Sequence, residues 1–181
     1  MISSRLNEYT RRRLLDKSKK DTPDKFNRRT EISNDEWSLL RVGLLELMAS
    51  EDLYIYFKVR DYRVDLRIVK FKPILEKYLN GKYKGDTTKA ITKALNHSLR
   101  YNHIQVSCSC PDFKYRYSYM ATIKNYGLDT DELRPANITN PKNKGGLCKH
   151  IMKVLNSPSL WSKKVVTALK SYVREYSKKE D

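Results

Sequence analysis

The chain has 181 residues, with 37 lysines and arginines against 21 aspartates and glutamates and a formal net charge of +16. Its length suffices for one domain with a core of its own, and no apolar run reaches the length of a membrane span. The N-terminus lacks the apolar segment of a signal peptide, so we expect an intracellular protein with reduced cysteines. The excess of positive charge favours a polyanionic partner or a crowded assembly.

Residues 1–31 form a strongly basic segment, with ten lysines and arginines against five acidic residues. Few apolar side chains accompany them, so burial cannot by itself offset the entropy lost on ordering. We therefore expect an N-terminal arm that docks on a partner, with Arg11, Arg12 and Arg13 as candidate contacts. A flexible basic tail is the alternative. Residues 32–181 would then form the single folded domain.

A helix is expected directly after this arm. Ser33 and Glu36 have the spacing of a capping box. Apolar residues follow at helical intervals, namely Trp37, Leu40, Leu44, Leu47 and Met48. The pattern predicts a core-facing helix of about 16 residues.

Two strands are predicted next, at 53–59 and 62–70, because apolar and polar residues alternate in both. They favour an antiparallel hairpin, and the absence of glycine in the turn favours a loop longer than two residues. The polar face of this hairpin combines aromatic and cationic side chains: Tyr54, Tyr56, Lys58, Arg63 and Arg67. Such a face can stack on bases and hold phosphates, but a solvated sheet face is the simpler interpretation.

Further helices are predicted from Pro73 to Gly81, from Asp86 or Thr87 through Leu99, and from Pro158 onward. Ile104, Val106 and Cys108 alternate with polar residues, which predicts a short third strand at 103–108. Residues 127–147 are rich in turn-forming residues and predict a long loop.

The cysteines carry the clearest chemical signal. Cys108 and Cys110 form a C-x-C pair, and after 37 intervening residues Cys148 and His150 form a C-x-H pair. Three thiolates and one imidazole fill a tetrahedral shell, which is typical of structural zinc, whereas catalytic zinc keeps an open position. The pattern predicts one structural Zn²⁺, with one pair at a strand end and the other at a helix start.

Two alternatives to this ligand set stay open at the level of the sequence. The cysteines could form one disulfide and leave a free thiol, or all three could be buried and inert. The fourth ligand could be His103 or His97 in place of His150, although only His150 has the paired spacing.

This pattern resembles the SWIM-type zinc finger, whose signature is C-x-C, a variable spacer and C-x-H. The resemblance covers residues 103–155 and rests on Cys108, Cys110, Cys148 and His150. It implies a module that binds DNA or other proteins and is not itself an enzyme. The wider segment from Cys108 through 134–141 to His150 also resembles segments of tailed-bacteriophage proteins, which implies a virion protein found in the particle or the host cytoplasm.

A candidate contact surface lies beside the predicted metal site. The helix expected after Cys110 has an apolar face and, on its other side, Lys114, Tyr115, Arg116 and Tyr119. Tyrosine-rich faces suit protein contacts as well as nucleic acid. The alternative is that most of these rings belong to the core.

These patterns together predict an α+β fold, in which a small antiparallel sheet, made of a hairpin and a short strand, packs with about six helices around one zinc ion. No phosphate-binding glycine loop, dinucleotide fingerprint or acidic cluster suggests an enzyme or a small-molecule substrate. Two functions remain. The first is an architectural component of a nucleoprotein assembly, such as a virion head or neck, bound to other virion proteins and the nucleic-acid backbone. The second is a free DNA- or RNA-binding protein.

Overall fold

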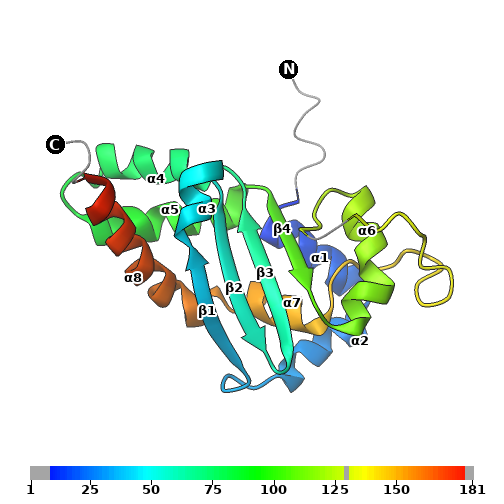
Figure 1. The fold of residues 1–181 in the computed structure, drawn as a ribbon. Helices are drawn as coiled ribbons and strands as arrows, with labels where there is room; N and C mark the ends of the chain where they lie inside the picture. Colours follow the sequence, from blue (N-terminus) through cyan, green and yellow to red (C-terminus); the bar gives the residue numbers. More distant parts are fainter. Residues whose placement is uncertain (1–8, 129–130, 178–181) are drawn as a thin grey trace.

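The computed structural model describes residues 9–128 and 131–177. Its centre is an antiparallel sheet of four strands in the order β1-β2-β3-β4, which are Trp37–Gly43, Leu53–Val59, Tyr62–Ile68 and Ile104–Cys108. Helices α5 (Thr87–Tyr101), α7 (Lys149–Asn156) and α8 (Pro158–Ser177) lie behind the sheet in Figure 1. Between sheet and helices lies the hydrophobic core, which includes Phe57, Leu66 and Trp161. The expected α+β class is confirmed.

The remaining helices are α1 (Arg11–Asp21), α2 (Pro23–Asn27), α3 (Leu44–Ser50), α4 (Phe71–Asn80) and α6 (Ser118–Ile123), with a 3-10 turn at Arg28–Glu31 and a π-helical turn at Phe113–Tyr117. The described residues thus contain eight α-helices, where about six were expected. Asp86 caps α5 as predicted, because its carboxylate accepts a hydrogen bond from the Lys89 amide at 2.9 Å. Within residues 9–128 and 131–177, no helix is both long and apolar enough to span a bilayer.

The prediction of a helix after Ser33 is wrong for the first half of that segment. Trp37–Gly43 forms strand β1, which pairs with β2, and only Leu44–Ser50 is helical. A β-bulge between Leu39 and Arg41 interrupts the alternation of side chains. With Leu40 displaced at the bulge and 54% exposed, the apolar spacing imitates a helix. Pairing with the buried strand β2 overrides the local preference.

The capping-box residues serve a turn instead of a helix. Glu36 still accepts a hydrogen bond from the Ser33 amide at 2.7 Å, but it also pairs with Arg60 at 2.5 Å. Arg60 lies in the β2–β3 turn with a left-handed φ of 54°. Because Val59 pairs with Tyr62, this loop has only two residues, and the longer loop expected from the sequence is wrong. The contacts from Glu36 help to hold a residue that lacks glycine's freedom at positive φ.

The basic N-terminal segment, as far as it is described, docks on the chain's own domain. Leu14, Leu15 and Phe26 are buried in the common core. The Tyr9 amide donates to His103 Nδ1 at 2.9 Å, and the Tyr9 carbonyl accepts from the Ile104 amide at 2.9 Å. Residues 9–31 therefore contribute to the domain that was expected to begin at residue 32, whereas residues 1–8 lie outside the described part.

On the polar face of the sheet, aromatic, cationic and acidic side chains contact one another. The Tyr56 ring is only 8% exposed, because Arg41 and Arg63 lie over it at 4.0 and 5.0 Å from the ring centroid. Each arginine also pairs with an acid, Arg41 with Glu46 and Arg63 with Asp65, both at 2.7 Å. Cations already occupy the ring faces on which a base would stack. This arrangement favours the solvated-face interpretation over the nucleic-acid one.

Candidate metal centre

The end of β4, the segment that follows it and the start of α7 deliver the four predicted ligands. Cys108 is the last residue of β4, and Cys110 lies two residues later, just before the π-helical turn. Cys148 is the N-cap of α7, and His150 lies in the first turn of that helix. The expected placement, with one pair at a strand end and one at a helix start, is what the structure shows.

The ligand atoms of these four residues lie within 4.8 Å of one another, and all four residues are buried. Cys108 Sγ is 3.9 Å from His150 Nδ1. Zinc–ligand bonds of about 2.0–2.3 Å place the corners of a tetrahedron roughly 3.6–3.8 Å apart, close to this spacing. All three cysteines are free thiols, so the disulfide alternative finds no support in this geometry.

The thiols are also electrostatically coupled. The hydrogen bond shared by Cys108 and Cys110 raises the pKa of Cys108 and lowers the pKa of Cys110. Burial raises the pKa of Cys148. A divalent cation at the centre of the three thiols would favour the ionised form of all three.

His150 is built into the site, whereas His103 is used elsewhere. The His150 ring packs against Tyr62, with 4.8 Å between the centroids. Its Nε2 is buried and has no hydrogen-bond partner among the described residues, which is costly for a polar atom. The other ring nitrogen, Nδ1, lies 3.9 Å from Cys108 Sγ and is the atom placed to ligate a metal. The Nδ1 of His103 accepts from the Tyr9 amide, outside the cluster.

The segment before Cys148 holds the second ligand pair in place. Gly145 has φ of +69°, and its amide donates to Asp21 at 3.1 Å. The Tyr126 hydroxyl donates to the Gly146 carbonyl at 3.2 Å, and a Cβ on Gly146 would lie 2.8 Å from that hydroxyl oxygen. Glycine is thus required at 145 by the backbone conformation and at 146 by the close approach of a ring.

Comparison with known proteins identifies this arrangement. Residues 103–157 match the SWIM zinc finger. The match spans less than a third of the chain and agrees with the 103–155 segment expected from the sequence. Searches of curated proteins and of solved structures found no match to the chain. The resemblance to bacteriophage proteins therefore receives no support from these comparisons.

The SWIM finger contains a Cys₃His group that fits one structural zinc ion. When bound, the ion would supply folding free energy by joining β4, the π-helical turn and α7. The chain's own residues orient the ligands: the Phe113 amide donates to Cys110 Sγ at 3.3 Å, and Tyr62 packs on the imidazole. A complete four-ligand shell leaves no position at which a substrate would bind the metal.

The residues predicted as contacts fall into two groups on different elements. Arg11, Arg12 and Arg13 open α1, where Arg12 pairs with Asp16 at 3.5 Å and Arg13 lies over the Tyr9 ring. The second group is on the π-helical turn and α6 beside the metal. The structure brings neither group into the ligand cluster.

The second group is only partly available to a partner. Tyr115 is 60% exposed, Lys114 is exposed, and Tyr119 is half-buried. Arg116 pairs with Asp112 at 3.2 Å, and the neighbouring Tyr117 is fully buried. Tyr117 therefore belongs to the core, Tyr115 to the surface, and Tyr119 is intermediate. The segment thus fits neither a wholly exposed contact surface nor a wholly buried set of rings.

Proposed function

We propose that the protein is a non-enzymatic, zinc-stabilised module that binds the phosphate backbone of nucleic acid. The observation that carries the proposal is a closed Cys₃His centre in a chain of net charge +16. The metal supports the fold and takes no part in chemistry, so function falls to the surface. A surplus of cations on that surface favours phosphate contacts that do not depend on base sequence.

The test combines metal analysis with binding at several salt concentrations. The zinc-loaded protein is titrated against a short DNA duplex, a single-stranded DNA and an RNA of the same sequence. We expect one zinc per chain and an affinity that falls steeply between about 50 and 200 mM salt, because bound phosphates release counterions. Affinity that is absent at low salt, or that does not depend on salt, would overturn the proposal.

The same module has two possible settings. In the first, it is an architectural component of a nucleoprotein assembly such as a virion head or neck, where the exposed Tyr115 would contact another protein. In the second, it is a free DNA- or RNA-binding protein. An assembly component stays attached to a protein partner in high salt, whereas a free binder is released from nucleic acid as salt rises. Sedimentation of the native complex in high salt separates the two.

A further inference from the structure

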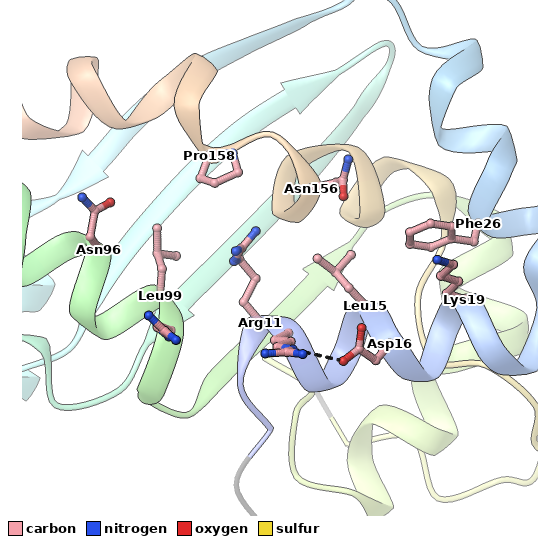
Figure 2. A pocket seen from close by; sticks show the side chains of 11 residues that line it. Arg11, Leu15, Asp16, Lys19, Phe26, Asn96, Leu99, Asn156 and Pro158 are labelled. Carbon is pink, nitrogen blue, oxygen red and sulfur yellow. Dashed lines mark ion pairs between the residues drawn. The ribbon is translucent and has the colours of Figure 1, made fainter.

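A cavity of about 580 Å³ lies between α1, α5 and the start of α8. Figure 2 shows Arg11 in the middle of its lining residues, between Leu99 of α5 and Leu15 of α1. The cavity has the size of a small-ligand site. It is separate from the zinc centre, because none of its lining residues is a metal ligand.

Positive charge dominates the lining. Arg11, Arg12, Lys19 and Arg100 face a single acid, Asp16, which gives a local balance of +4 and −1. Asp16 pairs with Arg12 at 3.5 Å, but the two side chains are 69% and 81% exposed, so the pair is weak. Lys19 and Arg100 are exposed and form no ion pair within the described part of the chain. The cavity thus repels metal cations and attracts anions.

Arg11 distinguishes this site from a loose group of surface lysines. Its Nη1 donates to the Leu155 carbonyl at 2.8 Å, which fixes the guanidinium against the last turn of α7. Its Nε is buried and has no partner among the described residues. Burial lowers the pKa of Arg11. A bound anion would compensate the desolvated charge.

Apolar side chains in the cavity and exposed cations along α5 suit a ligand larger than a single anion. The floor is apolar and includes Leu15, Phe26 and Leu99, which suits a sugar or a base edge. Along α5, the exposed residues Lys89, Lys93, Asn96 and Arg100 follow one another at helical spacing. The last two of these line the cavity. A polyanion seated in the cavity would therefore meet further cations along the same helix.

We propose that this cavity binds a phosphate group of the nucleic-acid backbone, held by Arg11, Lys19 and Arg100. The inference rests on the proposed function and assigns its principal contact to α1 and α5, away from the SWIM finger. Arginine donates to phosphate from a fixed planar fork, and Arg11 is already oriented by Leu155. Arg100 and Lys19 add charge from the other sides of the cavity.

The experiment compares two pairs of charge-neutralising substitutions. The test variant is Lys19→Gln with Arg100→Gln, and the matched control is Lys124→Gln with Lys142→Gln, all four residues being exposed. Both variants lose two positive charges, so a nonspecific loss of net charge affects them alike. Equal melting temperatures of the zinc-loaded proteins would show that the exposed substitutions leave the fold intact.

Binding to a short DNA duplex is measured by fluorescence anisotropy as a function of salt. In the test variant the slope of log affinity against log salt falls by about 1, because the contact with one phosphate group is lost. The control keeps the wild-type slope. Equal losses in the test and control variants would overturn the assignment of the cavity, while binding by the wild type would still support the proposed function.

Inorganic phosphate provides an independent probe of the cavity. We expect phosphate to shift the NMR signals of α1 and α5 in the wild type and not in the test variant. The same shifts without any binding of nucleic acid would refute the proposed function and reassign the cavity to a free phosphorylated ligand. The absence of both responses would refute the cavity as a phosphate site.

Discussion

The zinc centre and the polar face of the sheet both join distant parts of the chain, the first at a single point and the second through contacts spread over several strands. The zinc centre gathers four buried ligands from the end of β4, the segment just after it and the start of α7 at one point. The polar face spreads its contacts over β1, β2 and β3, and the Tyr56 ring has two arginines over it. Loss of any one of the four ligands disrupts the whole zinc centre. Loss of one side chain from the polar face removes only the contacts of that side chain.

The largest effect is expected from Cys148→Ser. Loss of a ligand removes the metal and leaves two buried cysteines and His150 without a common partner. We expect the free energy of unfolding to fall by more than about 4 kcal/mol. Zinc analysis and urea unfolding of the zinc-loaded proteins measure both losses.

Lys149→Met is the control for this substitution, since Lys149 lies between two ligands and forms a partly exposed ion pair with Glu31 at 3.2 Å. It should keep its zinc and lose less than about 1 kcal/mol. If the Cys148→Ser protein retained one zinc and a wild-type unfolding curve, the metal centre as described would be wrong.

The next effect is expected within the polar face, at its most buried acid. Asp52 is 3% exposed and accepts hydrogen bonds from Arg67 Nε and from the Lys70 amide, both at 2.7 Å. In Asp52→Ala both donors lose their partner, at a cost of about 2–3 kcal/mol. Asp61→Ala, in the exposed β2–β3 turn, should stay within about 0.5 kcal/mol of wild type. Similar unfolding energies for the two variants would contradict this ranking.

A smaller effect tests the redundancy around Tyr56. In Arg41→Gln the ring keeps Arg63, and in Arg63→Gln it keeps Arg41. The double variant should therefore lose about 0.5–1 kcal/mol more than the sum of the single losses. A double-mutant cycle in urea measures this coupling. Strict additivity would show that the two arginines act independently.

The smallest effect on stability is expected at Tyr115, which lies beside the metal but is 60% exposed. Tyr115→Ala should change the free energy of unfolding by less than about 0.5 kcal/mol. Tyr117→Ala, two residues later, removes a fully buried ring and should cost about 3–5 kcal/mol. Thermal melts of the two proteins would show whether exposure alone separates these tyrosines.

The sequence predicted most where a local pattern and its tertiary role agree. The hairpin alternates cleanly because its strands are half-buried. Short-range geometry places the two ligands of each C-x-C or C-x-H pair near each other, and the fold then brings the two pairs together. Strand β1 was missed because a bulge at Leu40 shifts the apolar spacing toward that of a helix. Its pairing with β2 is a long-range contact that no local pattern reports.

The docking of α1 and the cavity beside it were beyond the sequence for a related reason. Arg11 was identified as part of a basic run, but its bond to the Leu155 carbonyl joins residues 144 positions apart. Arg100 and Lys19 carried no distinguishing signal, since charged helix positions are common throughout the chain. Charge alone could not separate the arginines of the polar face, Arg41, Arg63 and Arg67, which have acidic partners, from Lys19 and Arg100 at the cavity.

The long segment between Cys110 and Cys148 is anchored at both ends by the metal centre. Among its described residues, Ile138 is 95% exposed, so its side chain contributes little to the core. Because the ends of this segment are fixed by the ligands, its length can change at little entropic cost. The region around Ile138 is therefore a natural place to insert a fluorescent label or an affinity tag, and the same tolerance would let evolution lengthen or shorten the spacer without rebuilding the domain.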